Sequence, residues 1–324
     1  MSNPLGIEPV DVFLRKNTAQ PIWLWDNQLA LGCISILVGQ PKAGKSIFIK
    51  NFIRAVSVGA DFLGKKTLKS SVLYFAFEDH EAMLQRELRN LEIVNQGVHV
   101  KIGISEISED EKFAAIEEYC NENQINCIVI DPLVYFFNIG DTNDYQKVYS
   151  RMSKIKRLAK TLNCHIVIIH HSNKGTSDSA KQILGSNAFF ASCDGAIILN
   201  RNKDNTSSIK SELRYGESIF DPLCFRYDKQ KQIIFEGAYK QHKENEKKSK
   251  LLQFLEKNSD SNFEVIRTDL SISDQLLNTL LSSLIEQQIV QKKGKGTKGA
   301  PHTYSLLRIE YLGSEENNVG AVCN

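Results

Sequence analysis

The sequence lacks the features of a membrane or secreted protein. No apolar run approaches the roughly 18 residues that a membrane-spanning helix requires. The first residues, Met1-Ser2-Asn3-Pro4, do not begin a signal peptide. The seven cysteines form no Cys-x-x-Cys motif and no Cys/His ligand pair, so we expect free, mostly buried thiols in a reducing compartment. These absences predict a cytoplasmic protein without membrane association.

A strong charge of either sign is also missing. The 40 Lys and Arg residues nearly balance the 38 Asp and Glu residues, which gives a formal net charge of +2. Any basic surface that binds nucleic acid must therefore be local. The hydrophobic content of 42% and the charged content of 24% are ordinary for a globular protein, and 324 residues suffice for one α/β domain and a smaller second domain.

One motif organises the rest of the chain. The apolar run 34–38 leads into Gly39-Gln40-Pro41-Lys42-Ala43-Gly44-Lys45-Ser46, and an apolar helical stripe begins at Ile47. The spacing G-x-x-x-x-G-K-[ST] between a strand and a helix predicts a phosphate-binding loop. Its glycines let backbone N–H groups turn toward phosphate oxygens, Lys45 can reach the outer phosphates, and the Ser46 hydroxyl suits Mg²⁺. Residues 39–47 therefore predict binding of a nucleoside triphosphate, ATP, with Mg²⁺.

Two later strands end in carboxylates. The apolar run 72–77 is followed by Glu78 and Asp79, and the run 127–130 is followed by Asp131. In open α/β sheets the chemistry lies beyond the carboxyl ends of the strands. Glu78 is therefore a candidate base for the water that attacks the γ-phosphate. Its alternative role is to cap the following helix, a role that we assign rather to Asp79. Asp131 is the expected partner of Mg²⁺ together with Ser46.

A third apolar strand, 166–169, ends at His170 and His171. Neighbouring residues on a strand point to opposite faces, which argues against one metal ion held by both histidines. A polar side chain at this strand end could instead hydrogen-bond the γ-phosphate. The Ser/Thr/Gly-rich segment that follows carries Lys174 and Lys181, and it is a candidate DNA-contacting loop.

The segments around the expected ATPase domain, residues 31–240, have simpler patterns. Residues 1–30 contain both tryptophans, Trp23 and Trp25, and are expected to pack on the core. The tryptophans could form a lid near the nucleotide, but we expect them to cover the open edge of the sheet. Residues 241–250 are almost entirely polar and predict a linker or the solvated start of a helix. Residues 310–324 are expected to be a disordered tail.

The C-terminal residues 251–309 predict a separate small domain. Three apolar helical patterns are followed by a β-hairpin, which is the layout of a winged helix. The hairpin contains a run of lysines without an acidic residue, and such a run suits phosphate contacts, although winged helices also dock proteins. The candidate DNA-binding residues here are Lys292, Lys293, Lys295 and Lys298.

Residues 30–240 together resemble the RecA-type ATPase core and, within it, the hexameric replicative DNA helicases of the plasmid RepA type. The likeness rests on V-G-Q-P-K-A-G-K-S, Y-F-A-F-E-D, V-I-D-P-L, I-I-H-H-S-N-K and G-S-N-A-F-F, in that order. It implies an α/β fold, with a RecA-like P-loop core built on a mainly parallel sheet, followed by the winged helix. It also implies that Glu78 is the base, that Asp131 binds Mg²⁺ through water, and that His170 or His171 senses the γ-phosphate.

The resemblance further implies a ring with shared active sites. Related ring helicases supply an arginine to the neighbouring subunit's γ-phosphate from a K-x-R-x-G segment. The comparable stretch is Glu212-Leu213-Arg214-Tyr215-Gly216, in which Arg214 fits and Glu212 replaces the lysine. Arg201 is a second candidate. The implied function is a homo-hexameric DNA helicase that moves on single-stranded DNA, with a replication initiator or a primase as a further partner.

Two other functions compete with this one. An ATP-switched DNA-binding, regulatory or helicase-loading protein would use the winged helix to choose its site or partner, without a transferred arginine or a DNA loop. A metabolite kinase would leave both the His-His-Ser-Asn-Lys segment and the winged helix without a role. We therefore predict an ATPase whose function is that of a replicative motor of a plasmid, a phage or another mobile element.

Overall fold

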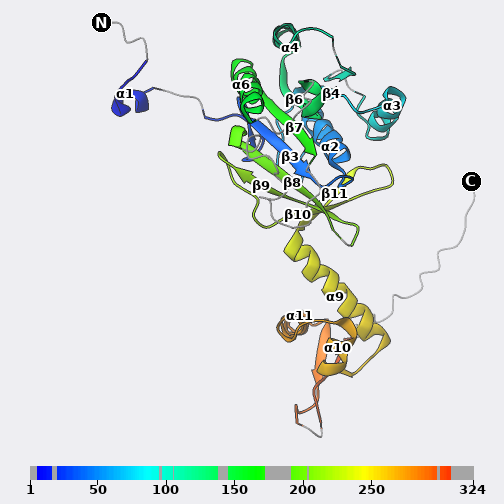
Figure 1. Cartoon of the computed structure of the whole chain (residues 1–324). Coiled ribbons are helices and arrows are strands. Elements are labelled where there is room, and N and C mark those ends of the chain that lie inside the picture. The colour runs from blue at the N-terminus through cyan, green and yellow to red at the C-terminus, as the bar shows by residue number, and fades with distance from the viewer. Residues whose placement is uncertain are drawn as a thin grey trace, which may run out of the picture. The chain divides into compact units, whose positions relative to one another are not determined.

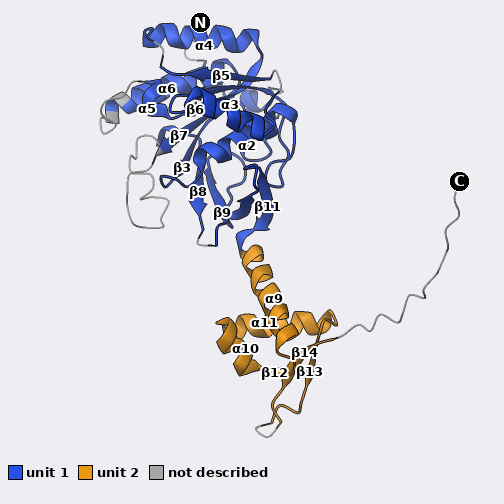
Figure 2. Ribbon diagram, turned by 90° about the vertical axis from the view of Figure 1, so that its right-hand side faces the viewer, with its two compact units in different colours: residues 1–239 blue, residues 240–324 orange. Residues whose placement is uncertain are grey.

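The computed structural model describes residues 6–16, 20–94, 97–104, 106–137, 145–171, 191–202, 204–297 and 300–307. Lys174, Lys181, Lys298, the G-S-N-A-F-F motif and the expected tail 310–324 lie outside these residues. The described chain divides into two compact units, residues 1–239 and 240–324, which are coloured separately in Figure 2. No helix among the described residues is both long and apolar enough to cross a membrane.

The first unit is built on a nine-stranded sheet, seen in Figure 1, in the order β11-β10-β9-β8-β3-β7-β6-β4-β5. Strands β8, β3, β7, β6, β4 and β5 run parallel to one another, and β9, β10 and β11 continue the sheet from β8 in antiparallel fashion. The predicted α/β fold with a mainly parallel sheet is confirmed. The strands are β3 (Ile34–Gly39), β4 (Ser71–Ala76), β5 (Val98–Ile102), β6 (Ile125–Asp131), β7 (His165–His171), β8 (Gly195–Arg201), β9 (Ser207–Leu213), β10 (Leu223–Tyr227) and β11 (Ile233–Ala238).

Helices cover both faces of the parallel strands, because the strand residues are apolar on both sides. On β3, Ile36 belongs to one buried cluster and Leu37 to the other. Helices α4, α5 and α6 contribute to the first cluster, and α2 and α3 to the second. The helices are α2 (Lys45–Val58), α3 (Glu81–Asn90), α4 (Glu109–Glu122), α5 (Leu133–Phe136) and α6 (Tyr145–Thr161).

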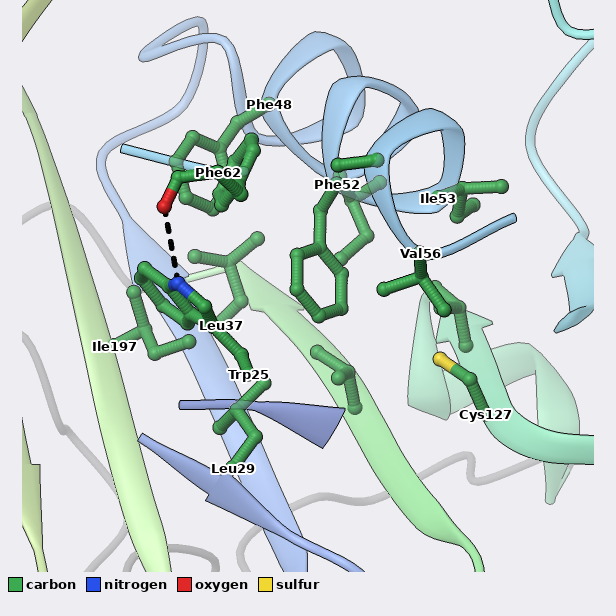
Figure 3. Packing of buried hydrophobic residues seen from close by; sticks show 14 of the residues in the cluster. Trp25, Leu29, Leu37, Phe48, Phe52, Ile53, Val56, Phe62, Cys127 and Ile197 are labelled. Atoms are coloured by element: carbon green, nitrogen blue, oxygen red, sulfur yellow. Dashed lines mark hydrogen bonds between the residues drawn. The ribbon is translucent and has the colours of Figure 1, made fainter. Parts of the chain in front are cut away.

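The N-terminal residues pack differently from the expectation. Strands β1 (Trp23–Trp25) and β2 (Leu29–Ala30) form a separate two-stranded sheet. Trp25 is fully buried against Phe52 and Phe62, and its Nε1 donates a 3.0 Å hydrogen bond to the carbonyl oxygen of Phe62, as Figure 3 shows. Its cluster includes Leu37 of the central strand β3, so Trp25 covers a face of the sheet and not its open edge. The short helix α1 (Val10–Leu14) buries none of its residues.

A buried histidine joins β7 to β3 and β2. His165 is 2% exposed, its Nδ1 lies 2.7 Å from the carbonyl oxygen of Ala30, and its Nε2 lies 2.9 Å from the hydroxyl of Ser35. A carbonyl oxygen only accepts, so Nδ1 carries the proton and Nε2 accepts from Ser35. Burial lowers the pKa of His165 from 6.5 to about 4, although Ala30 and Asp194 oppose the shift. The folded protein therefore holds this imidazole neutral.

This histidine predicts an acid-sensitive fold. As the pH falls below 6.5, His165 becomes protonated in the unfolded chain, but in the folded protein it stays neutral until about pH 4. The free energy of unfolding therefore has its full value above pH 6.5 and falls between pH 6.5 and 4. The loss is roughly 3 kcal/mol for a shift of this size. This loss can be measured by denaturant unfolding at a series of pH values from 7.5 to 4. His165→Asn should flatten this part of the profile, whereas exposed His80→Asn should not, and an unchanged slope in His165→Asn would contradict the assignment.

The second unit has its own core. It contains α9 (Tyr239–Lys257), β12 (Ser261–Asn262), α10 (Phe263–Leu270), α11 (Asp274–Glu286), β13 (Val290–Lys293) and β14 (Thr303–Leu306). The three strands form an antiparallel sheet in the order β12-β14-β13. Leucines of α9 and α11 pack with Ile266, Val290 and Tyr304 in a buried cluster. The described residues of this unit thus form three helices and a small sheet.

Residues 241–250 are not an unstructured linker but part of α9. Of the two alternatives, the structure shows the start of a solvated helix. Glu246 pairs with Lys243 at 3.0 Å and with Lys250 at 2.8 Å, which are the i,i+3 and i,i+4 spacings that stabilise a polar helix. The polar composition therefore reflects ion pairs along a helix.

Candidate functional site

The loop between β3 and α2 has the geometry of a phosphate cradle. Gly44 has φ +94° and directly precedes α2, and Lys42 also adopts a positive φ of +65°. At Gly39 the chain passes so close to β8 that a Cβ atom would lie 2.6 Å from the carbonyl oxygen of Leu199. A residue with a side chain would not fit there without a shift of the backbone. The loop thus curls tightly onto the N-terminus of α2, where N–H groups and the helix dipole favour an anion.

Lys45 is buried under this loop. It is 4% exposed, and its Nζ donates hydrogen bonds to the carbonyl oxygens of Gly39 at 2.7 Å and Gln40 at 3.1 Å. Burial lowers the pKa of Lys45, while the nearby charges of Asp131 and Glu78 act to raise it. The structure therefore brings the predicted lysine and both predicted carboxylates together at one edge of the sheet.

Asp131 ends β6 at this edge, where Ala76 of β4 is its register partner. The carboxylate is 5% exposed, and burial followed by the charge of Asp79 raises its pKa. Hydrogen bonds from Ser46 and Tyr74 and the charge of Lys50 act in the opposite direction. A hydroxyl and a carboxylate in contact at the end of the phosphate loop are hard oxygen ligands of the kind that Mg²⁺ prefers. The residues present therefore fit this ion.

Glu78 follows β4 in the short connection to α3 and is exposed at the carboxyl end of the strand. The preceding N–H, that of Phe77, donates to the carbonyl oxygen of Asp131 at 2.9 Å, which joins the two strand ends. The N-cap residue of α3 is His80, whose side chain makes no capping hydrogen bond, so neither Glu78 nor Asp79 occupies the cap position. The prediction of Asp79 as the cap is therefore wrong.

The histidine pair lies beside the loop strand. Val38 and His170 are register partners in the parallel pair β3/β7, as are Gly39 and His171. The side chain of His171 lies outside the described part of the chain, so the expected placement of the two side chains on opposite faces stays a prediction. His170 is half-buried at the same edge of the sheet as Lys45 and Asp131.

Comparison with known protein families shows to which family the chain belongs. The model of the family described as AAA domain matches residues 2–177, which include the loop, Glu78, Asp131 and the histidine pair. The chain belongs to this family of P-loop ATPases. No curated protein sequence matches the chain significantly. The AAA domain match ends before β8, although β8 and the strands after it belong to the same sheet.

Two buried polar residues beside the AAA domain site, Tyr74 and Lys50, were missed by sequence reasoning. The hydroxyl of Tyr74 lies 3.2 Å from Oδ2 of Asp131 and 3.3 Å from Oδ2 of Asp79. The Nζ of Lys50 contacts Asp79 at 2.9 Å and Glu87 at 2.6 Å. The signal in the sequence was a lysine within the apolar stripe of α2 and a tyrosine within the apolar strand 72–77. Both are polar groups at buried positions, which need partners.

The two candidate arginines lie beyond the matched residues, at opposite ends of the strands of the nine-stranded sheet. Arg201 ends β8 on the edge of the phosphate loop, and its charge opposes the burial that raises the pKa of Tyr227. Arg214 follows β9 at the other edge, where its N–H donates to the carbonyl oxygen of Asp194 at 2.8 Å and its guanidinium lies 3.8 Å from that carboxylate. The structure therefore places the first candidate, Arg214, and the second candidate, Arg201, at opposite ends of the strands.

Tyr227 is a further residue that the sequence did not single out. A Cβ atom at Gly44 would lie 3.5 Å from the Tyr227 hydroxyl, which is buried and has no hydrogen-bond partner among the described residues. The turn after it is fixed to α2, because Asn51 donates to the carbonyl oxygen of Lys231 and accepts from the N–H of Ile233, both at 2.9 Å. The antiparallel strands therefore support the AAA domain's phosphate loop.

The surface around the lysines of the second unit is less basic than the run of lysines in the sequence predicts. Lys292, Lys293 and Lys295 are exposed. Nζ of Lys293 pairs with Asp260 at 3.1 Å, so an acid that is distant in sequence partly neutralises the run. Lys292 and Lys293 are neighbours on β13 and point to opposite faces. Lys292 and Lys295 thus remain the stronger candidates for phosphate contact.

Proposed function

We propose that this ATPase is a RecA-type motor that forms a ring, a hexamer, and hydrolyses ATP while moving on single-stranded DNA as a replicative helicase. The observation that carries the hydrolysis is the convergence of Lys45, Asp131 and Glu78 at the loop. The sequence likeness to plasmid replicative helicases supports the motor. It also favours a plasmid, a phage or another mobile element as the setting, with an initiator or a primase as a further partner.

The chain's own residues divide the chemical work. Bound Mg²⁺ would supply charge neutralisation at the outer phosphates, and Ser46 and Asp131 are the residues that would hold it. Lys45 exchanges its bonds to the carbonyl oxygens of Gly39 and Gln40 for phosphate oxygens. Glu78 accepts the proton of the attacking water. His170 or His171 hydrogen-bonds the γ-phosphate and transmits its loss to the segment after β7.

The position of Arg214 supports a site that is completed by a neighbour. The seven-residue strand β8 separates the edge that holds Arg214 from the loop edge, a distance on the order of 20 Å. That span exceeds the reach of an arginine side chain, so Arg214 serves a γ-phosphate on another subunit. Arg201 lies beside the phosphate loop of its own subunit, so any contact that it makes with the phosphates is within that subunit.

This assignment predicts complementation between inactive subunits. Arg214→Ala should lower the rate of hydrolysis at least tenfold, because the charge that stabilises the transition state is lost. Glu78→Gln subunits keep Arg214 but lack the base. Mixed in equal amounts, the two variants should regain about a quarter of the wild-type rate, since each intact site next to an intact arginine works. No regain in a formed oligomer would contradict transfer between subunits, and Arg201→Ala mixed in the same way should regain nothing.

For the second unit we propose a winged helix that contacts DNA. The order of helix, short strand, two helices and hairpin supports this fold. Exposed Lys292 and Lys295 would contact phosphates, and this would set affinity without reading sequence. On the first unit, Lys174 and Lys181 would contact the strand being moved.

An ATP-switched DNA-binding or loading protein is the second candidate, and it is favoured by Glu212 in place of the lysine of the K-x-R-x-G segment.

Native mass measurement with ATP, together with assays of ATPase stimulation and duplex unwinding by single-stranded DNA, tests the motor. We expect a ring whose ATPase rises on single-stranded DNA and which separates a forked duplex. A monomer that is indifferent to DNA would contradict the motor. An ATP-dependent DNA binder without unwinding would favour the second candidate.

A further inference from the structure

Lys50 is an unusual residue for its position. It lies in α2, five residues after Lys45, and its side chain is 1% exposed. An ammonium group is buried this deeply only when it is paired, and here two carboxylates, Asp79 and Glu87, accept from its Nζ at 2.9 and 2.6 Å. Burial alone would lower the pKa of Lys50, but the bonds to Glu87 and Asp79 raise it, so the lysine is charged.

The two carboxylates differ in where they are attached. Glu87 lies in the middle of α3, whereas Asp79 lies in the short connection 77–80 and is the residue next to Glu78. The Asp79 side chain therefore joins this connection to α2 through the ion pair with Lys50. Lys50 therefore fixes the backbone on which Glu78 is carried.

A second contact ties the same carboxylate to the strand end that would hold Mg²⁺. The hydroxyl of Tyr74 lies between Oδ2 of Asp79, at 3.3 Å, and Oδ2 of Asp131, at 3.2 Å. A hydroxyl has one proton, so it bridges the two carboxylates by donating to one of them at a time. The place of Asp79 is thereby fixed from two sides, by α2 and by the end of β6.

We propose that Asp79, held by Lys50 and Tyr74, is a positioning residue that sets the orientation of Glu78 toward the attacking water. The inference rests on the proposed role of Glu78 as the base. Positioning of a general base matters because proton transfer requires hydrogen-bond geometry, within about 2.6–3.2 Å between heavy atoms. Without the ion pair, the connection 77–80 would sample other conformations, and fewer of them would place Glu78 correctly.

The matched variants are Asp79→Asn and Glu87→Gln. Each removes one carboxylate charge from the same buried lysine and leaves it the other, but only Asp79 adjoins the base. We expect Asp79→Asn to lower kcat at least tenfold and to keep the Kd for Mg²⁺·ATP within about threefold. Glu87→Gln should keep kcat within about twofold. Equal losses in both folded variants, or a wild-type kcat in Asp79→Asn, would overturn the proposal.

A double variant separates positioning from a general structural role. If Asp79 acts through Glu78, adding Asp79→Asn to Glu78→Gln should cause no further loss in single-turnover hydrolysis. A further loss equal to that in the single variant would overturn the proposal. If Asp79→Asn does not fold, Tyr74→Phe can replace it as the test, because this variant leaves both ion pairs of Lys50 in place. A wild-type kcat in Tyr74→Phe would also overturn the proposal. Full activity in Glu78→Gln alone would instead overturn the proposed base.

Discussion

Replacing Lys45 by alanine is expected to abolish ATP hydrolysis, with a loss of about 10³-fold or more, the range found when a charge that stabilises phosphoryl transfer is removed. The ammonium group is buried beneath the loop and already points at its carbonyl oxygens, so it is in place to meet the outer phosphates. A steady-state ATPase assay and a titration with a fluorescent ATP analogue measure the loss of turnover and of binding.

A control is needed because the same substitution removes two hydrogen bonds to the loop. Thermal unfolding of Lys45→Ala shows whether the fold persists without nucleotide. Lys66→Ala removes an exposed lysine of the same unit and should leave turnover unchanged. Wild-type hydrolysis in a folded Lys45→Ala protein would show that the phosphates do not bind at this loop.

Glu78→Gln is expected to bind ATP but to hydrolyse it about 10²–10⁴-fold more slowly, the usual contribution of a general base. The amide has nearly the shape of the carboxylate but cannot take the proton of the attacking water. Burst kinetics with ATP should show nucleotide bound and retained on the protein. Because the charge of Glu78 acts on Lys45, binding should weaken by no more than a small factor, or strengthen.

The matched control for this variant is Glu81→Gln. Glu81 lies in the first turn of α3, three residues along the chain, and is exposed to solvent. The same change of charge there should leave turnover as in the wild type. If the two variants behave alike, the loss reflects a change of charge near α3, and Glu78 is not the base.

The strands and the loop could be predicted because local patterns determine them. The apolar run before Gly39, the glycine spacing and the carboxylate at the end of 127–131 are each short-range signals. Parallel pairing then brings their carboxyl ends together at one edge, so the coming together of Lys45, Glu78 and Asp131 followed from topology.

The network of Tyr74, Lys50 and Asp79 could not be predicted in the same way. Its contacts join α2, β4 and the start of α3, and the pairing depends on which face of each element is turned inward. Asp79 matched the local signal for a helix cap, but a buried ammonium group 2.9 Å away provided a stronger partner. Long-range electrostatics thus overrode a local preference.

The arginines show a second limit of sequence reasoning. Arg201 and Arg214 are only 13 positions apart in the sequence, yet the antiparallel turn between β8 and β9 sends them to opposite edges of the sheet. The K-x-R-x-G pattern favoured Arg214, and the departure at Glu212 weakened that preference. Strand direction, which the motif does not contain, distinguishes a residue beside its own loop from one that faces outward.

The pairing of β3 determines when this strand can be completed while the chain is being translated. The phosphate loop is encoded near the N-terminus, but its strand is bordered by β7 on one side and by β8 on the other. Gly39 packs directly on Leu199, which lies beyond the part of the chain that matches the family. A ribosome must therefore release almost two thirds of the chain before this strand loses its open edge. The nucleotide site is translated early and assembled late.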